Sequence, residues 1–171
     1  DELGSYVPLE LDFVNEADNA EKAARQLAGR SDVRVPRIHR EHTTRRLLVM
    51  EFVDGIKITD VERLREAGVD LQRVAQTLIE TYCEQVLVHG FFHADPHPGN
   101  LLVEPGSSRL VMLDFGLAKD LPPGFREAVV RLVVSLRKDD ADALAAALFD
   151  MGFETRSGER EALGQAARFF L

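Results

Sequence analysis

Two short stretches decide how this chain is interpreted: His93-Ala94-Asp95-Pro96-His97-Pro98-Gly99-Asn100 and, a hairpin's length later, Leu113-Asp114-Phe115-Gly116. Asp95 and Asn100 lie five positions apart, across a loop that two prolines stiffen. Asp114 follows a short apolar run of the kind that forms a strand. Carboxylate and amide oxygens are ligands that Mg²⁺ prefers in proteins. Together the two stretches predict a site for Mg²⁺ and for the phosphate groups that it accompanies.

The spacing of these residues is that of the protein-kinase catalytic loop, in which an aspartate, four intervening residues and an asparagine follow one another. Asp95 is expected to orient or deprotonate the attacking group. Asn100 is expected to offer its amide oxygen to one metal ion, and Asp114 to be the main magnesium ligand. Gly116 is expected to let the backbone turn after Asp114 without steric cost. Phosphoryl transfer depends mostly on such positioning and on electrostatic stabilisation.

The rest of the chain predicts an α+β fold. Apolar residues recur at helical spacing from 71 to 86, which predicts the strongest helix. The run 46–53 is rich in strand formers and stops at Asp54-Gly55, a turn signal. Thr59 is expected to cap a short helix that ends at Ala67. Further helices are expected at 15–27, 125–136, 142–151 and 160–171, and further strands at 33–38, 101–103 and 110–113.

Composition places the chain among globular proteins, since 45% of its 171 residues are hydrophobic and 29% are charged. A net charge of −8 argues against a dedicated nucleic-acid-binding surface. The single cysteine, Cys83, excludes an internal disulfide, and its apolar helical surroundings predict that it packs in the core. No apolar run approaches the roughly 18–20 residues that a membrane span requires. A further core face is expected on the helix at 125–136, from Phe125, Val129, Leu132, Val133 and Leu136.

At the catalytic loop the resemblance to known proteins becomes specific. His-Ala-Asp-Pro-His-Pro-Gly-Asn is similar to the signature of the UbiB/ABC1 (AarF, ADCK-like) atypical kinase family. Residues 10–19, Glu-Leu-Asp-Phe-Val-Asn-Glu-Ala-Asp-Asn, resemble that family's Glu-x-Asp motif and the start of its αC helix. Residues 50–55, Met-Glu-Phe-Val-Asp-Gly, resemble its hinge strand. The matches run from residue 10 to residue 116 in the family's order.

The resemblance implies roles for residues outside the catalytic loop. Glu16 corresponds to the αC glutamate, which pairs with a strand lysine and so orients the phosphates. Glu10 and Asp12 correspond to a family-specific acidic pair that contacts an N-terminal extension over the site. The hinge residues that are implied to bind and back the adenine ring are Met50, Glu51, Phe52 and Val53.

The resemblance also implies a protein-kinase-like fold, with a partial small lobe at 1–55 and a helical large lobe at 56–171. In the family, a phosphate-cradling loop and a strand lysine precede the αC glutamate. Only 15 residues precede Glu16, and neither Lys22 nor Lys57 matches the position of that lysine. The isolated chain is therefore expected to bind nucleotide poorly and to turn over little.

What the family does sets the functional expectation. The resemblance implies phosphoryl transfer or hydrolysis of Mg-ATP in support of ubiquinone and other isoprenoid-quinone biosynthesis. ATP or ADP and Mg²⁺ are the implied cofactors. Isoprenoid lipid intermediates and quinone-biosynthesis enzymes are the implied partners, and nucleic acid is not one. The implied location is the cytoplasm, at the inner face of a membrane through peripheral association.

Three other interpretations of the same residues stay open. An aminoglycoside- or choline-type phosphotransferase has a similar catalytic loop, although its metal motif usually lacks the Phe-Gly that follows Asp114. A pseudokinase would bind nucleotide without transferring phosphate. A zinc hydrolase could use His93, Asp95 and His97. However, apart from the two histidines and this aspartate, no further strong zinc ligand is evident near them. In the kinase-like interpretation, His93 is structural and packs near Asp-Phe-Gly, and His97 braces the loop.

Overall fold

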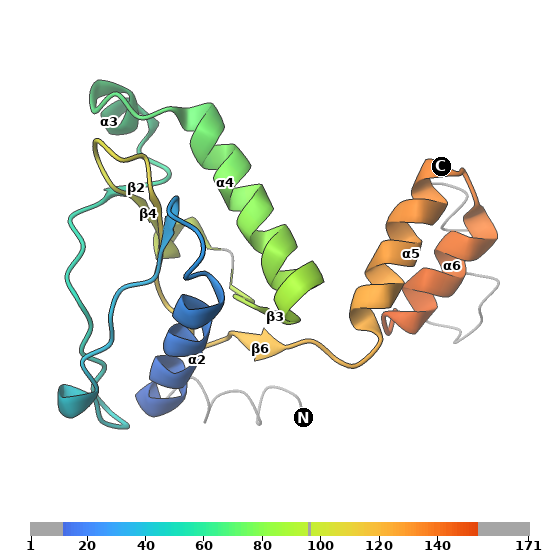
Figure 1. Cartoon of the computed structure of the whole chain (residues 1–171), viewed down its shortest axis with the longest axis horizontal. Coiled ribbons are helices and arrows are strands. Elements are labelled where there is room, and N and C mark those ends of the chain that lie inside the picture. Colours follow the sequence, from blue (N-terminus) through green and yellow to red (C-terminus); the bar gives the residue numbers. More distant parts are fainter. Residues whose placement is uncertain (1–11, 96, 154–171) are drawn as a thin grey trace. The chain divides into compact units, whose positions relative to one another are not determined.

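The computed structural model describes residues 12–95 and 97–153 and has the α+β architecture that the sequence predicts (Figure 1). The chain divides into two compact units, 1–120 and 121–171. The predicted boundary between lobes at residue 55 lies inside the first unit and stays a prediction. The elements are α2 (Phe13–Gln26), β1 (Val33–Arg34), η1 (Arg40–His42), β2 (Ile56–Lys57), α3 (Val61–Glu66), α4 (Leu71–Glu84), η2 (Gln85–His89), β3 (Phe91–Phe92), η3 (Pro98–Asn100), β4 (Leu101–Val103), β5 (Leu110–Met112), β6 (Lys119–Asp120), α5 (Phe125–Arg137) and α6 (Ala141–Asp150).

Helix α2 confirms the helix that was predicted at 15–27. Its first turn is capped by Asp12, whose Oδ1 accepts a backbone N–H of that turn at 3.1 Å. The buried side of the helix carries Ala17, Ala20 and Ala23. Small side chains on this side let the helix backbone lie close to the elements beneath it, which places the acidic residues of α2 near the catalytic loop.

The larger sheet has four short strands in the order β1–β5–β4–β2. Its centre is the predicted hairpin, β4 and β5, in which Leu101 pairs with Met112 and Val103 with Leu110. Strand β1 joins β5 in parallel, and β2 joins β4 in antiparallel orientation. The sequence did not predict β2, because two residues are too few to show an alternating pattern. The buried hairpin carries the residues just before the Asp-Phe-Gly turn to the centre of the unit.

The strand predicted at 46–53 is not formed, and this prediction was wrong. The segment makes isolated bridges, one of which joins Met50 to Ile38. Phe52 is 89% exposed, so its side chain does not pack against another strand or helix that the structure describes. Strand propensity becomes a strand only where a partner supplies a ladder of hydrogen bonds. For the same reason the strand predicted at 33–38 shrinks to the two residues of β1.

Helix α4 follows the apolar spacing predicted for 71–86 and passes into a π-helical turn, η2. Gly90 ends that turn with a φ of 62°, a left-handed conformation that glycine adopts without steric cost. Cys83 is exposed, so the prediction that its thiol packs in the core was wrong. The buried positions of α4 include Thr77 and Thr81. Position 83 lies roughly 200° around the helix from position 81, so it faces away from the core.

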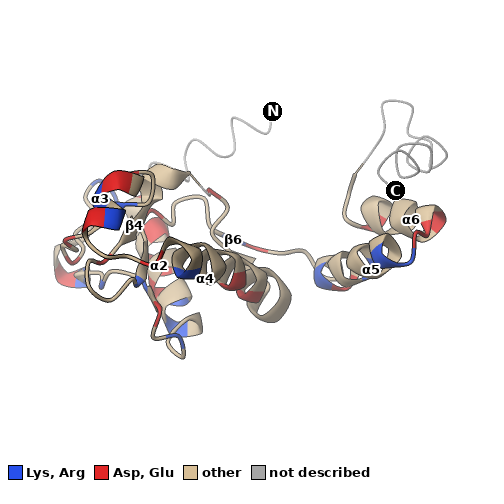
Figure 2. Ribbon diagram, turned by 90° about the horizontal axis from the view of Figure 1, so that it is seen from above, with Lys and Arg blue, Asp and Glu red and all other residues tan. Residues whose placement is uncertain are grey.

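Helix α3 confirms the short helix predicted before residue 67, but its cap differs. Asp60 rather than Thr59 accepts a backbone N–H of the first turn, at 3.3 Å. Acidic and basic side chains are interspersed along α3 (Figure 2), as expected of a solvated face. Its one buried residue, Leu64, anchors a small apolar cluster with Ile56 and Val103.

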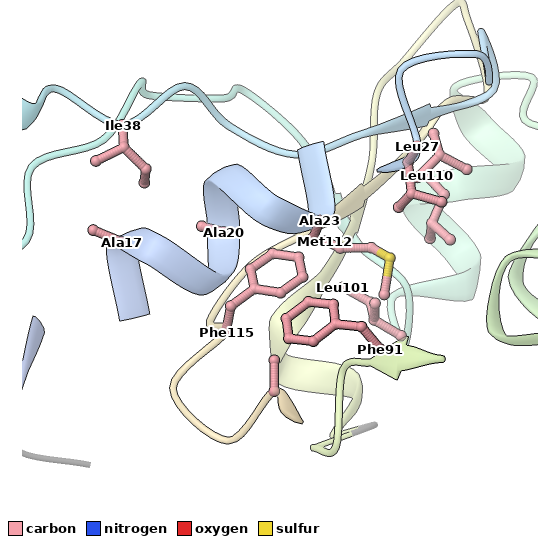
Figure 3. Packing of buried hydrophobic residues seen from close by; sticks show 12 residues of the cluster. Ala17, Ala20, Ala23, Leu27, Ile38, Phe91, Leu101, Leu110, Met112 and Phe115 are labelled. Atoms are coloured by element: carbon pink, nitrogen blue, oxygen red, sulfur yellow. The ribbon is translucent and has the colours of Figure 1, made fainter. Parts of the chain in front are cut away.

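The main core joins α2 to the hairpin and to the Asp-Phe-Gly turn (Figure 3). Met112 is fully buried, and Phe115 and Phe91 are each 2% exposed. The alanines of α2 belong to the same apolar cluster as these larger side chains, so the helix and the turn pack against one core. The position of the Asp-Phe-Gly segment is therefore set by core packing and not only by its own loop.

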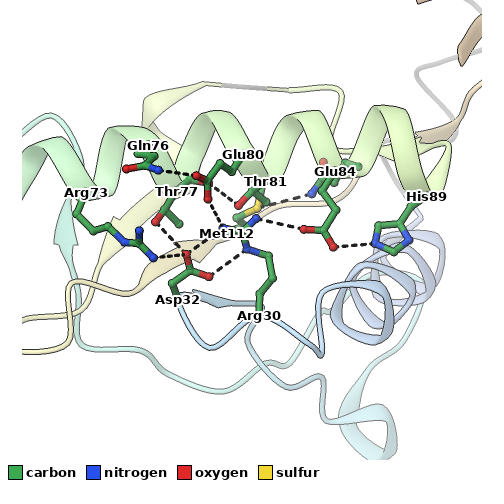
Figure 4. A network of polar contacts seen from close by, with 11 residues as sticks. Arg30, Asp32, Arg73, Gln76, Thr77, Glu80, Thr81, Glu84, His89 and Met112 are labelled. Atoms are coloured by element: carbon green, nitrogen blue, oxygen red, sulfur yellow. Dashed lines mark hydrogen bonds and ion pairs between the residues drawn. The ribbon is translucent and has the colours of Figure 1, made fainter. Parts of the chain in front are cut away.

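A polar network ties the loop after α2 to helix α4 (Figure 4). Arg30 donates to Asp32 at 2.9 Å through Nη2 and to Glu84 at 3.1 Å through Nη1. Thr77 Oγ1 donates to the Asp32 carboxylate at 3.0 Å. The hydrogen bond from Arg30 lowers the pKa of Asp32 despite its partial burial, and the one from Thr77 acts in the same direction. The network fixes α4 against β1 on the side of the helix that carries Glu84.

The second unit pairs the two predicted helices α5 and α6. Ala128 and Ser135 of α5 are its buried positions, whereas Val133 is 50% and Leu136 41% exposed. The predicted apolar face is therefore only partly in the core, because α6 covers a narrower side of α5. The helix predicted at 160–171 lies outside the described residues. Within residues 12–95 and 97–153, no helix combines the length and apolar character needed to cross a membrane.

Candidate active site

The catalytic loop runs from the end of β3 to the turn η3, directly before β4. The Asp95 carboxylate is held from two sides. Its Oδ2 accepts Asn100 Nδ2–H at 3.0 Å, and its Oδ1 accepts the His97 backbone N–H at 3.2 Å. Each carboxylate oxygen has a second lone pair and can still accept a proton or a hydrogen bond. Two residues that were predicted to act together, Asp95 and Asn100, are in direct contact.

His93 is 1% exposed and joins the catalytic loop to the segment before Asp114. Its Nε2 lies 2.7 Å from the Leu113 carbonyl oxygen, which can only accept, so Nε2 carries the proton. Nδ1 is then free to accept the Asp95 backbone N–H, at 3.3 Å. The ring lies edge-on to Phe115, with the centroids 4.8 Å apart. These contacts confirm the structural role that was predicted for His93.

Asp114 has a φ of 55°, in the left-handed region that aspartate adopts more readily than most residues. Its Oδ1 accepts the Gly116 backbone N–H at 3.2 Å. The left-handed residue of this turn is thus Asp114, whereas the freedom of the backbone to turn was attributed to Gly116. The glycine has another use: a Cβ there would lie 3.4 Å from Asp114 Oδ1 and 3.9 Å from Glu16 Oε2. Gly116 keeps the space between two carboxylates open.

Three of the predicted site residues, Glu16, Asp95 and Asp114, line one cavity of about 280 Å³. Burial, and then the negative charge of Asp114, raise the pKa of Glu16. A hydrogen bond from the Phe115 backbone N–H lowers it in part. No basic side chain contributes to this shift in the pKa of Glu16. The cavity therefore concentrates negative charge that a cation would offset.

A first prediction follows from the Glu16 carboxyl. Because its pKa is raised in the folded state, stability is lost as the pH rises from below 4.5 through the folded pKa. Glu16→Gln in this chain, without ligand, is expected to raise the free energy of unfolding at pH 7 by about 1 kcal/mol and to have no such effect near pH 4. Urea denaturation at the two pH values measures the difference. An equal effect at both values would show that ionisation of Glu16 is not the cause.

The donors around the cavity fit a hard divalent cation. Asp114 offers a carboxylate, and the amide oxygen of Asn100 takes no part in the bond from Asn100 Nδ2 to Asp95. Within the described parts of the chain, no three His, Cys, Asp or Glu side chains converge to hold a metal unaided. Three of the four ring nitrogens proposed for zinc are engaged elsewhere: both of His93 as above, and His97 Nδ1 in accepting the Gly99 N–H at 3.0 Å. That bond also makes His97 the brace of the loop, as predicted.

None of the hinge residues lines the carboxylate cavity itself. Met50 lines a second, much smaller cavity that Glu16 and Asp114 also reach. The Glu51 carboxylate pairs with Arg34 at 2.6 Å, and the Phe52 ring is exposed. Contact of the backbone at 51–53 (Glu51, Phe52, Val53) with adenine stays a prediction.

The structure describes only one of the two residues of the family acidic pair, Asp12. Glu10 lies outside the described residues. Asp12 caps α2 and pairs with Arg45 Nε at 3.1 Å. Its implied contact with an N-terminal extension stays a prediction.

Two polar residues at the site were not found from the sequence. The side-chain amide of Asn19, on α2, donates to the carbonyl oxygens of Phe115 at 3.0 Å and Ala118 at 3.2 Å. Gln85, on η2, is 2% exposed and contacts the start of the catalytic loop. The sequence feature that could have pointed to them is a polar residue on the buried side of an amphipathic helix. Such a residue needs a hydrogen-bond partner in the core.

Lys22 does not serve as the partner of Glu16. Its Nζ pairs with Asp120 at 2.5 Å and lies 4.1 Å from the centroid of the Phe91 ring. It thus ties α2 to the small sheet of β3 and β6. This agrees with the prediction that Lys22 does not occupy the position of the family's strand lysine.

The chain is similar to many proteins with kinase names. It is 39% identical over its whole length to ACTIVITY OF BC1 COMPLEX KINASE 8, a chloroplastic protein of Arabidopsis thaliana, and covers 23% of that protein. It is 41% identical over 82% of its length to AarF domain-containing protein kinase 1 of Gallus gallus, of which it covers 28%. The chain thus spans roughly a quarter of the length of these relatives.

One solved structure is similar to nearly the whole chain. The Rv3197–erythromycin complex from Mycobacterium tuberculosis matches 93% of this chain with a TM-score of 0.69 at 25% identity, and the chain covers 40% of it. Residues 1–148 match the family described as the ABC1 atypical kinase-like domain. The match includes the catalytic loop, the Asp-Phe-Gly turn and α2, whose side chains meet at one cavity. The chain belongs to the ABC1 atypical kinase-like family and has a protein-kinase-like fold.

Proposed function

We propose that this chain carries the metal- and phosphate-binding part of an ATP-dependent phosphotransferase or ATPase. The observation that supports it best is the meeting of Glu16, Asp95 and Asp114 at one cavity, with Asn100 bonded to Asp95. The charge gathered there suits Mg²⁺ together with a nucleotide, whose phosphates supply the remaining oxygen ligands. Mg²⁺, when bound, neutralises charge on the transferred phosphoryl group.

The residues of the chain divide the remaining work. Asp114 and the amide oxygen of Asn100 would hold the metal. Asp95, fixed by two hydrogen bonds, would accept the proton of the attacking hydroxyl or water. Glu16 would orient the phosphates through a lysine of the complete small lobe. His93 keeps Asp95 and the Leu113-Asp114 backbone in register, so that base and metal ligand face the same cavity.

The physiological task that we propose is support of ubiquinone or other isoprenoid-quinone biosynthesis at a membrane surface. This rests on family membership and concerns the full-length protein, of which isoprenoid intermediates and biosynthetic enzymes would be the partners. The acceptor would be one of those molecules or water.

The decisive test is ATP turnover by the full-length protein with Mg²⁺. Asp95→Asn is expected to lower kcat about 10²- to 10⁴-fold, because it removes the general base; asparagine keeps the size of the side chain and can accept one of the two hydrogen bonds. Asp18→Asn is the matched control, since that carboxylate is on the surface of α2 with 65% exposure. Turnover that survives in Asp95→Asn would contradict the proposal. Nucleotide binding without turnover in the wild type would instead favour a pseudokinase.

A further inference from the structure

Gln85 is a buried amide that no catalytic role accounts for. It is 2% exposed, at the first position of the π-helical turn η2 that extends α4. Removing an amide from water is unfavourable unless both of its ends find partners. The side chain has both: Oε1 accepts the His93 backbone N–H at 3.0 Å, and Nε2 contacts Met112 Sδ at 3.8 Å.

The two partners of Gln85 belong to the two halves of the candidate site. His93 opens the catalytic loop, and its ring accepts the Asp95 N–H. Met112 ends β5, two residues before Asp114. The last registered pair of β4 and β5 joins Met112 to Leu101, and the Leu113 N–H donates to the Asn100 carbonyl at 2.8 Å, so the backbone links only the end of the catalytic loop to this strand. Gln85 adds a side-chain link between the strand and the start of the loop at His93.

The backbone at Gln85 is unusual in a way that serves this bridge. A π-helical turn is rarer and less favourable than an α-helical one and often marks a functional site. Here the Gly90 N–H donates to the Gln85 carbonyl, which closes the wide turn. The same glycine returns the chain into β3, so that His93 passes the Gln85 side chain within hydrogen-bonding distance.

We infer that Gln85 is a positioning residue, which sets the catalytic loop against the metal-binding segment. It acts through His93 and Met112 and does not reach the cavity itself. If the side chain only filled space, an apolar side chain of similar size would serve as well, and without the cost of burying an amide. The expected effect on turnover rests on the proposed function, whereas the effect on the loop does not.

The test compares Gln85→Met with Thr81→Val in the full-length protein. Methionine keeps the volume and loses the acceptor for His93. Thr81 is 0% exposed one turn earlier on the same helix, and its hydroxyl donates to the Thr77 carbonyl within α4 at 2.6 Å. Thr81→Val therefore perturbs the core of α4 without touching the loop.

Gln85→Met is expected to speed hydrogen exchange of the loop at 93–100 about five- to tenfold, the size expected for one lost hydrogen bond. It is also expected to lower kcat about 10- to 100-fold, with the KM for Mg-ATP changed less than about twofold. Thr81→Val is expected to change neither. Unchanged loop exchange in Gln85→Met, or equal changes in both variants, would overturn the inference. Faster loop exchange in Gln85→Met, together with no turnover by the wild-type protein, would support the positioning role and contradict the proposed function.

Discussion

Asp114→Asn is expected to abolish the stabilisation of the full-length protein by ATP and Mg²⁺. A ligand that binds only the folded state adds about 2.7 kcal/mol at a hundredfold excess over its dissociation constant. For a domain of about 150–250 residues that corresponds to a rise in Tm of about 5–11 °C, and for a longer cooperative unit to a smaller rise. Asparagine keeps one neutral oxygen in place of the carboxylate, so the metal loses its charged ligand. The shift with Mg-ATP should vanish, while the Tm without ligand should stay close to that of the wild type.

The backbone at Asp114 makes asparagine the right substitution for this test. The φ of 55° is tolerated by asparagine and aspartate, whereas alanine would add strain and confuse metal loss with misfolding. Asp139 offers a matched control, because it is an exposed aspartate with a φ of 53° in the second unit. Asp139→Asn should leave the ligand-induced shift intact. An undiminished, magnesium-dependent shift in Asp114→Asn would rule out Asp114 as the principal metal ligand.

Phe115→Ala is expected to lower the free energy of unfolding by about 3–5 kcal/mol, the usual cost of removing a fully buried ring. Phe115 is 2% exposed and packs on the alanines of α2 and on the edge of the His93 ring. The cavity left by the substitution would lie directly behind Asp114. Chemical denaturation of this chain measures the change.

Phe52→Ala is the natural comparison, because that ring is 89% exposed. Its effect should stay within about 0.5 kcal/mol. Similar losses from both substitutions would mean that the Asp-Phe-Gly phenylalanine is not the core residue described above.

The parts of the site that the sequence could predict are those with fixed local spacing. Asp95 and Asn100 are near in sequence, and a turn stiffened by prolines leaves little choice in where their side chains lie. Asp114 follows a hairpin whose two apolar runs and polar turn are unmistakable. Glu16 is different: it is far from the others in sequence, and only its likeness to the αC glutamate brought it into the site.

The parts that failed depend on partners that a local pattern does not contain. The run at 46–53 has strand propensity but pairs only through isolated bridges. Cys83 has apolar neighbours in sequence, yet its own direction on α4 is toward solvent. The bonds of Asn19 and Gln85 span 96 and 8 positions in sequence, and neither amide was given a role from the sequence.

The bonds of Asn19 also have a mechanical consequence. One helix, α2, holds the Asp-Phe-Gly segment by the side chain of Asn19 at two carbonyl oxygens, and by Glu16 at the Phe115 N–H. A shift of α2 must either break these bonds or carry Phe115, and with it Asp114, along. If Asp114 holds the metal as proposed, a molecule that binds one position of α2 better than another would change the affinity for the metal from a distance. On that proposal, the position of the helix and the occupancy of the aspartate are coupled.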